Sequence, residues 1–237
     1  ISGISACSSA AGGLKMAAIG LVEELTVEAA KRACLGAGAI VKQVYSHHLT
    51  NKEAQELKDG DIDIVFLAGG TNGGNKECIL HNAKKIRDFE ITVPIIVAGN
   101  KDAYDEIEEL FKGTTVEYYL VNNVMPQLKK LDVEDAKHQI RKIFIDKIIE
   151  AKGIKKAEER IGEIIMPTPE AVLLAAELLS NGYEDEEGYG DLMVIDIGGA
   201  TTEVHTIGEG FPKRTEVILK GIEEQFEDDN KITISKS

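Results

Sequence analysis

Short apolar runs alternate with amphipathic stretches over the first two thirds of the chain, and this alternation restricts its fold more than any other feature. Short, predominantly apolar runs of this length are typical of strands that are buried on both faces. The intervening stretches place apolar residues on one helical face, as Ala29, Ala30, Ala33, Cys34 and Ala37 do. Strands that alternate with such helices predict βαβ units and a parallel sheet.

The predicted elements follow one another closely. Strands are expected at residues 15–22, 40–45, 62–68, 93–98 and 116–121, and helices at residues 26–37, 50–58, 76–89 and 102–112. Thr26 is expected to cap the first helix, and Thr50 with Glu53 has capping-box spacing for the second. Five strands joined by right-handed crossovers predict a doubly wound, flavodoxin-like α/β sheet.

The pattern becomes helical from Asp132 onward. Helices are predicted at residues 132–152 and 155–163, and a third begins at Thr168 as cap with Pro169 in its first turn. An acidic loop at residues 184–187 precedes two strands, at residues 192–195 and 203–207, and the chain closes in a polar tail from Asn230. We therefore predict an α/β domain at residues 15–125, a helical segment at 126–183 and a further partial domain at 190–237.

Composition excludes several classes of function. The 237 residues carry a formal net charge of −14, which disfavours nucleic-acid binding because that needs clustered cations. Cys7, Cys34 and Cys78 are odd in number and far apart, so they form neither a disulfide framework nor a CxxC knuckle. No apolar run approaches the ~20 residues that span a bilayer. We expect a cytoplasmic protein with no membrane partner.

A glycine turn directly after a buried strand is the strongest chemical signal. Backbone N–H groups of glycines and nearby hydroxyls can surround a phosphate, and a carboxylate at the strand end can hold hydrated Mg²⁺ or orient an attacking water. Asp196 is the predicted catalytic and magnesium-holding residue. The predicted phosphate-binding residues are Gly198, Gly199, Thr201, Thr202 and Glu203. The alternative is an ordinary hairpin with a two-glycine turn.

A second glycine-rich loop follows the predicted strand at residues 62–68 and opens a helix, which is a position where anions bind. Its candidate residues are Gly69, Gly70, Thr71, Gly73, Gly74 and Asn75. The loop nearly matches a P-loop, but Lys76 falls one residue late and Glu77 replaces the Ser or Thr. The sequence leaves two interpretations of this loop: it binds an anion, or it has only a structural role. The Asp-x-His-x-x-Gly signature of cobalamin domains is absent, so we expect no directly bound cobalamin.

Several motifs carry a resemblance to known families. Asp196-Ile-Gly-Gly-Ala-Thr-Thr-Glu-Val204 resembles the second phosphate motif of the actin, sugar-kinase and Hsp70-like ATPases, which have a ribonuclease H-like fold. The chain as a whole resembles the MutL family associated with glutamate mutase, which is unrelated to the mismatch-repair protein of similar name. The motifs that carry this likeness lie at residues 8–16, 67–75, 81–84, 94–100, 123–126 and 166–169.

The resemblance implies an ATP-dependent reactivating chaperone that uses ATP and Mg²⁺ and whose partners are subunits of a cobalamin-dependent mutase of the glutamate mutase type. The superfamily's earlier phosphate loop, Asp-x-Gly-Ser/Thr-x-Thr, and its later adenosine motif are not found, and the chain opens at Ile1. We therefore expect a fragment with half of a phosphate site, and ATPase activity only in the intact protein. A small-molecule kinase, or a regulatory domain without nucleotide binding, is the alternative.

Overall fold

Five parallel strands form the larger sheet in a computed structural model that describes residues 6–8, 13–34, 37–150, 164–198, 202–208, 222–225 and 232–236. The strands are β2 (Leu14–Gly20), β3 (Ala39–Ser46), β4 (Ile64–Leu67), β5 (Ile95–Val97) and β6 (Tyr118–Leu120). Their order in the sheet is β3-β2-β4-β5-β6, so the chain winds to one side of β2 and then to the other. This order confirms the predicted doubly wound α/β fold.

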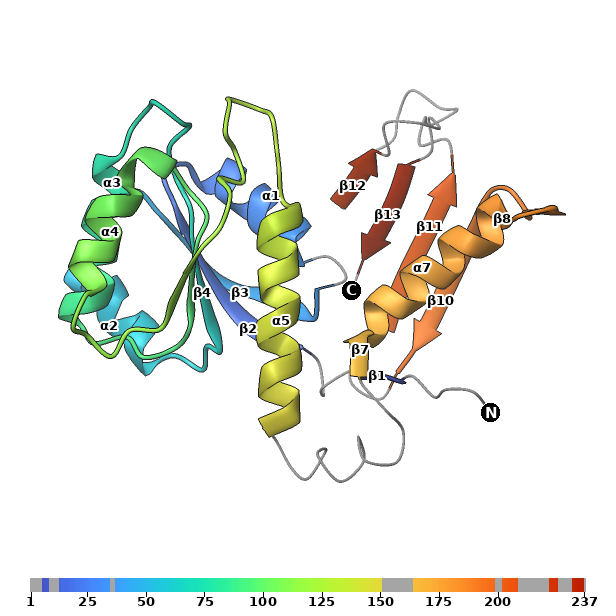
Figure 1. The fold of residues 1–237 in the computed structure, drawn as a ribbon, viewed down its shortest axis with the longest axis horizontal. Coiled ribbons are helices and arrows are strands. Elements are labelled where there is room, and N and C mark those ends of the chain that lie inside the picture. The colour runs from blue at the N-terminus through green and yellow to red at the C-terminus, as the bar shows by residue number, and fades with distance from the viewer. Residues whose placement is uncertain are drawn as a thin grey trace.

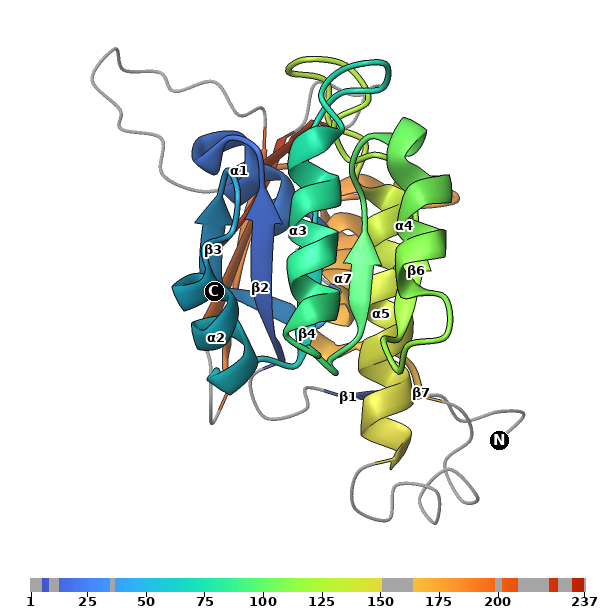
Figure 2. The same cartoon turned by 90° about the vertical axis from the view of Figure 1, so that its left-hand side faces the viewer.

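Helices cover both faces of this sheet. The helices are α1 (Glu23–Cys34), α2 (Asn51–Asp59), α3 (Glu77–Asp88), α4 (Tyr104–Phe111) and α5 (Glu134–Glu150), with a 3₁₀ turn at Lys101–Ala103 before α4. Figure 1 shows α2, α3 and α4 on one side and α1 and α5 on the other, and Figure 2 shows the strands between them.

The pleat of β2 divides the core into two layers. Met16 and Ala18 are fully buried in the cluster that includes α1 and α5, whereas Ala17 and Ile19 are fully buried in the cluster formed with α2, α3 and α4. Both residue sets are apolar because neither face meets water, which explains the unbroken apolar runs. On α5, Ile140 and Phe144 are buried in the first of these clusters, so this helix packs directly on the sheet.

The structure corrects one predicted cap and confirms the other. Helix α1 begins at Glu23, so Thr26 lies inside it and donates from Oγ1 to the carbonyl of Val22 at 2.6 Å. The acidic first turn, Glu23 and Glu24, complements the helix dipole there. At α2 the capping box is present, because Thr50 Oγ1 accepts from the Glu53 amide and the Glu53 carboxylate accepts from the Thr50 amide.

A second, antiparallel sheet lies beside the first. Its strands are β10 (Leu192–Ile197), β11 (Thr202–Gly208), β12 (Ile222–Gln225) and β13 (Ile232–Lys236), in the order β10-β11-β13-β12. Helix α7 (Thr168–Asn181) contacts β10 and β11 and covers one face (Figure 1). The predicted polar tail is wrong, because β13 pairs with both β11 and β12. The predicted cap is also wrong, because Thr168 is the first helical residue and no side chain caps α7.

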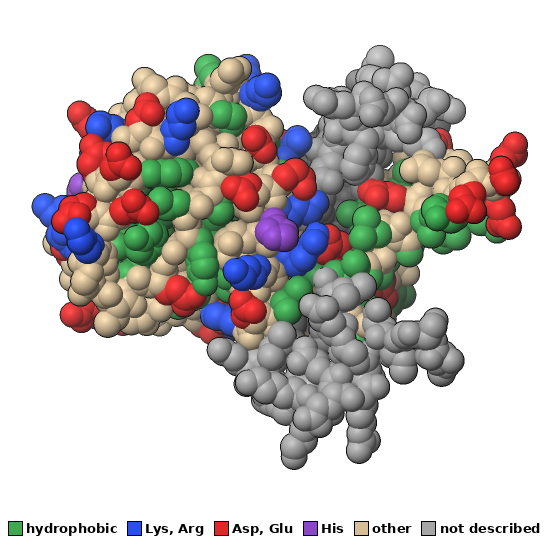
Figure 3. All heavy atoms as spheres, in the orientation of Figure 1, with side chains coloured by type: hydrophobic (Ala, Val, Ile, Leu, Met, Phe, Trp, Pro, Cys, Tyr) green, Lys and Arg blue, Asp and Glu red, His purple; other side chains and the backbone are tan. Residues whose placement is uncertain are grey.

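Two short strand pairs complete the described structure. Strand β1 (Ala6–Ser8) pairs in parallel with β7 (Ile164–Pro167), and β8 (Gly182–Tyr183) pairs with β9 (Glu186–Glu187). The acidic loop predicted at residues 184–187 is thus the tip and second strand of a small hairpin, whose carboxylates project at the far right of Figure 3. The helix predicted at residues 155–163 lies outside the described residues. None of the described helices is long and apolar enough to cross a membrane.

Candidate functional site

The strongest candidate lies on the hairpin of β10 and β11. The two strands are antiparallel, with Asp196 opposite Glu203 and Ile197 opposite Thr202, which confirms the predicted hairpin. Gly198 follows β10 and is exposed, as is Thr202 at the start of β11. Gly199 and Thr201 lie outside the described residues. The described residues therefore place Asp196, Gly198, Thr202 and Glu203 together around one turn.

Two carboxylates face one another in this hairpin. Directly opposed residues of paired strands project from the same face, so Asp196 and Glu203 share the face that α7 covers. Asp196 is half-buried and Glu203 is buried. Like charges placed directly opposite destabilise a sheet, and a buried carboxylate needs a compensating partner. The pair therefore requires a cation, a proton or bound water nearby.

Among the described residues, no group forms a hydrogen bond with the buried end of the Glu203 side chain. Glu203 Oε2 accepts no hydrogen bond, and the nearest cationic candidate is His205 Nε2 at 3.6 Å, which is charged only when protonated. Both ring nitrogens of His205 are also buried without a hydrogen-bond partner. A buried polar atom in this condition is typical of a site for water or an ion.

These residues fit hydrated magnesium better than a metal enclosed by protein ligands. Magnesium keeps several waters and is often held by one or two carboxylates together with substrate phosphates. Within the described ranges no group of three or more His, Cys, Asp or Glu side chains could hold a metal ion. Asp196 and Glu203 therefore fit a role in which Mg²⁺ is shared with phosphate oxygens.

In the second candidate, the glycine loop between β4 and α3, three backbone amides already donate to other groups of the protein. The amide of Gly73 donates to Asp102 Oδ2 at 2.8 Å, that of Gly74 to the carbonyl of Thr71 at 2.9 Å, and that of Asn72 to the carbonyl of Pro126 at 3.2 Å. An anion at Gly73 would first have to displace the Asp102 carboxylate. These bonds give the loop a structural role whether or not it binds an anion.

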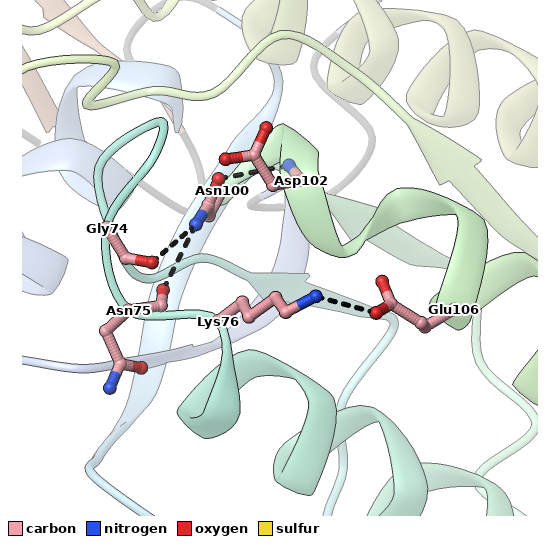
Figure 4. A network of polar contacts seen from close by, with 6 residues as sticks. All are labelled: Gly74, Asn75, Lys76, Asn100, Asp102 and Glu106. Carbon is pink, nitrogen blue, oxygen red and sulfur yellow. Dashed lines mark hydrogen bonds and ion pairs between the residues drawn. The ribbon is translucent and has the colours of Figure 1, made fainter.

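Two buried asparagines hold the loop from the neighbouring strand ends. Asn100 donates from Nδ2 to the carbonyl of Gly74 at 3.1 Å and accepts from the amide of Asp102 at 3.0 Å (Figure 4). Asn123 donates from Nδ2 to the carbonyl of Gly70 at 3.0 Å. The sequence analysis placed both asparagines in motifs that carry the family resemblance but assigned neither of them a role. Both lie two residues after the end of a predicted apolar strand, where the carboxyl ends of parallel strands meet, and that position is the signal that could have identified them.

Lys76 is engaged in an ion pair at the start of α3. Its Nζ lies 2.8 Å from Glu106 Oε1, and Figure 4 shows the two side chains pointing toward each other. This hydrogen bond raises the pKa of Lys76 and lowers the pKa of Glu106, so both groups stay charged at neutral pH. The ammonium group is therefore directed at α4 rather than at the loop amides.

Packing explains one of the loop glycines. Gly70 has φ +75°, and a Cβ added there would collide with the backbone carbonyl of Asn75. Only glycine fits this position, because the backbone folds back on itself and adopts a left-handed conformation. The glycine content of the loop is thus explained in part by its own fold.

Comparison with known proteins gives the family. The family model described as "MutL protein" matches residues 1–231. A curated relative, "Protein MutL" from Clostridium tetanomorphum, is 58% identical over 221 residues, which cover 93% of this chain and 48% of the relative. The chain thus spans about half the length of the curated relative that it matches. The match over nearly the whole chain shows that this protein belongs to the MutL family, the glutamate-mutase-associated family that its motifs resemble.

Proposed function

We propose that the whole protein is an ATP-dependent reactivating chaperone of a cobalamin-dependent mutase of the glutamate mutase type. In this proposal residues 190–237 belong to an actin-like ATPase domain, and this chain supplies half of its phosphate site. Family membership supports the association with glutamate mutase. The observation that carries the ATPase part is the opposition of Asp196 and Glu203 beside the glycine turn, with Glu203 Oε2 buried and unpaired.

The proposed chemistry is hydrolysis of the terminal phosphate of ATP. Magnesium bound with ATP neutralises charge on the phosphate oxygens. Asp196 would hold this hydrated ion or orient the attacking water, and Glu203 lies opposite it as a second carboxylate on the same face. In this proposal the amides of Gly198 and Gly199 and the hydroxyls of Thr201 and Thr202 would donate to phosphate oxygens; Gly199 and Thr201 lie outside the described residues. Hydrolysis then drives a domain closure that releases damaged cofactor from the mutase.

The test is phosphate release by the full-length protein carrying Asp196→Asn. The substitution keeps the shape of the side chain and removes the charge that holds magnesium. We expect ATP turnover in the presence of the mutase to fall by about 100-fold or more, which is the scale seen when one preorganised electrostatic group is lost. Asp185→Asn is the matched control, because Asp185 is exposed at the tip of the β8–β9 hairpin.

The same assay distinguishes a reactivating chaperone from a small-molecule kinase. A chaperone releases inorganic phosphate from ATP with no acceptor and is stimulated by the mutase, whereas a kinase transfers phosphate to a polar substrate. Turnover of Asp196→Asn equal to that of Asp185→Asn would remove Asp196 from the mechanism. Absence of mutase stimulation in the unmodified protein would refute the chaperone role while leaving the ATPase site intact.

A further inference from the structure

His205 on β11 is an enclosed polar side chain that the proposed phosphate chemistry does not use. The residue is 2% exposed, and both ring nitrogens are buried without a hydrogen-bond partner among the described residues. Buried polar side chains nearly always have such a partner, so each exception points to a specific interaction. A leucine or phenylalanine would fill this space without the cost of burying polar atoms. Packing alone therefore does not explain a histidine at this position.

The ring lies on the same face of β11 as Glu203. Burial alternates along the strand, and Glu203, His205 and Ile207 are its buried positions. Residues that alternate in this way project from one face of a sheet. Helix α7 contacts β11, and its own buried residues include Leu173 and Ala176. The ring is thus enclosed with the Glu203 carboxylate in the layer between the strand and the helix.

The ring and the carboxylate match each other as donor and acceptor. His205 Nε2 lies 3.6 Å from Glu203 Oε2, the oxygen that is buried and unpaired within the described ranges. A shift of about 0.4 Å brings the two atoms into the range of an N–H···O bond, about 2.7–3.2 Å. An imidazole carries an N–H at Nε2 when it is protonated and also in one of its neutral tautomers, whereas an ionised carboxylate only accepts. The contact therefore requires no particular charge on the ring.

The neighbouring strand β10 provides no competing side-chain acceptor directly opposite the ring. Opposed residues of paired strands lie side by side, and the residue opposite His205 is Val194, whose side chain has no polar atom. Asp196 lies opposite Glu203, one step closer to the glycine turn on the same face. His205 therefore supports Glu203 from the side away from the turn.

We propose that His205 is a positioning residue, which donates from Nε2 to Glu203 and fixes the direction of its carboxylate beside Asp196. A carboxylate that is held at one oxygen presents its other oxygen in one direction. Loss of such a supporting partner typically lowers ion affinity or activity by about 10–100-fold. The expected effect on ATP turnover rests on the proposed function, whereas the contact between His205 and Glu203 does not.

The contact is tested by nitrogen–proton correlation spectra of the full-length protein with isotope-labelled histidine side chains. We expect a ring N–H signal from His205 that exchanges with water at least about tenfold more slowly than that of His138, which is exposed on α5. The signal is assigned by its absence in His205→Gln. In Glu203→Gln, which keeps the shape of the side chain, it should move upfield, because a bond to a neutral acceptor is weaker. An unchanged signal in Glu203→Gln would overturn the contact.

The positioning role is tested by ATP turnover of the full-length protein with the mutase. His205→Phe keeps a ring but removes both nitrogens, and we expect kcat to fall by about 10–100-fold while KM for ATP changes by less than about threefold. His205→Gln should restore most of the turnover, because its amide nitrogen lies near the position of Nε2. His205→Asn, whose nitrogen lies near the position of Nδ1, should stay impaired. Ile207→Ala is the control, because it loosens the same buried face without removing a donor.

Equal turnover of His205→Phe and the unmodified protein would overturn the positioning role. A loss in Ile207→Ala as large as that in His205→Phe would also overturn it, by assigning the effect to packing. If His205→Phe does not fold, the comparison of His205→Gln with His205→Asn decides, and equal turnover of these two contradicts the proposal. Absence of ATP turnover in the unmodified protein would refute the proposed function instead, and the ring signal would still decide whether His205 holds Glu203.

Discussion

Asparagine side chains fix the loops at the carboxyl edge of the larger sheet. An amide offers two N–H donors and one carbonyl acceptor, so one side chain can hold two backbone segments at once. Asn100, which is fully buried, uses this capacity to join the glycine loop to the 3₁₀ turn before α4. Asn122 is exposed, which makes it a natural comparison.

Replacement of Asn100 tests this anchoring role. Asn100→Ala leaves the carbonyl of Gly74 and the amide of Asp102 without their partner. Gly74 and Asp102 are themselves exposed, so water can take the place of the lost partner in part. Because each hydrogen bond contributes about 0.5–1.5 kcal/mol net, we expect the free energy of unfolding to fall by about 1–3 kcal/mol. Urea unfolding followed by circular dichroism measures this loss. Asn122→Ala should change stability by less than about 0.5 kcal/mol, and an equally small effect at Asn100 would contradict the anchoring role.

The same residues show how far the sequence predicts the candidate sites. Turn chemistry is local, so it singled out the glycines and Asp196 from adjacent residues alone. The partners of Asn100 and Asn123 in the glycine loop lie 26 and 53 residues away in the chain. Only the fold of the parallel sheet brings them together. The unpaired Glu203 oxygen likewise depends on α7 covering β11, which no local pattern reveals.

At the scale of whole elements, the predictable strands are those with the longest apolar runs. All five strands of the parallel sheet overlap the predicted ones. Burial on both faces demands a continuous apolar sequence in β4 and β5, whereas the partly buried β3 tolerates Lys42 and Gln43. The strands that we missed are short or mixed, such as β1, β7 and β12. Strand β13 did carry a signal, since Ile232 and Ile234 alternate with Thr233 and Ser235, but the polar composition of that region concealed it.

Contact between elements also restricts which residue can occupy position 38, where Gly38 directly precedes β3. Its φ is +84°, and a Cβ added there would lie 2.5 Å from Phe144 Cδ2 of α5. Gly38→Ala should destabilise the protein by about 2–4 kcal/mol, because the overpacking cost adds to the cost of a left-handed alanine. Gly113→Ala is the control, because Gly113 has φ +75° with nothing within 4 Å of the added Cβ.

Comparison with Gly113→Ala separates the cost of the clash with Phe144 from the cost of the left-handed backbone conformation. Gly113→Ala should cost about 1 kcal/mol, which is the backbone part alone. Thermal unfolding of both variants gives the difference. Equal losses at the two positions would show that α5 moves aside and that Phe144 does not hold the β3 entry.

At the scale of the molecule, an ion pair between Arg141 and Glu170 links the helices that pack on the two sheets. Arg141 on α5, which packs on the parallel sheet, contacts Glu170 on α7, which packs on the antiparallel sheet. The Glu170 side chain is 8% exposed and that of Arg141 is 28% exposed. Arg141 Nε and Glu170 Oε2 lack further hydrogen-bond partners, so the two charges depend chiefly on each other for compensation.

Removal of one partner should therefore cost more than removal of both. Arg141→Met leaves a buried carboxylate without compensation, and we expect a loss of about 3 kcal/mol, the lower end for buried pairs because Arg141 is partly solvated. Arg32→Met is the control, because Arg32 pairs with Glu28, which is 53% exposed, and such surface pairs contribute only about 0–1 kcal/mol.

The double variant Arg141→Met with Glu170→Leu replaces the pair by apolar side chains of similar size. Its stability should return to within about 1 kcal/mol of the unmodified protein, because burial of two charges is no longer needed and the contact between α5 and α7 is kept. Chemical unfolding of the four proteins of this cycle measures the coupling. If the two single losses simply add, the two charges do not compensate each other, and other contacts between α5 and α7 hold the two helices together.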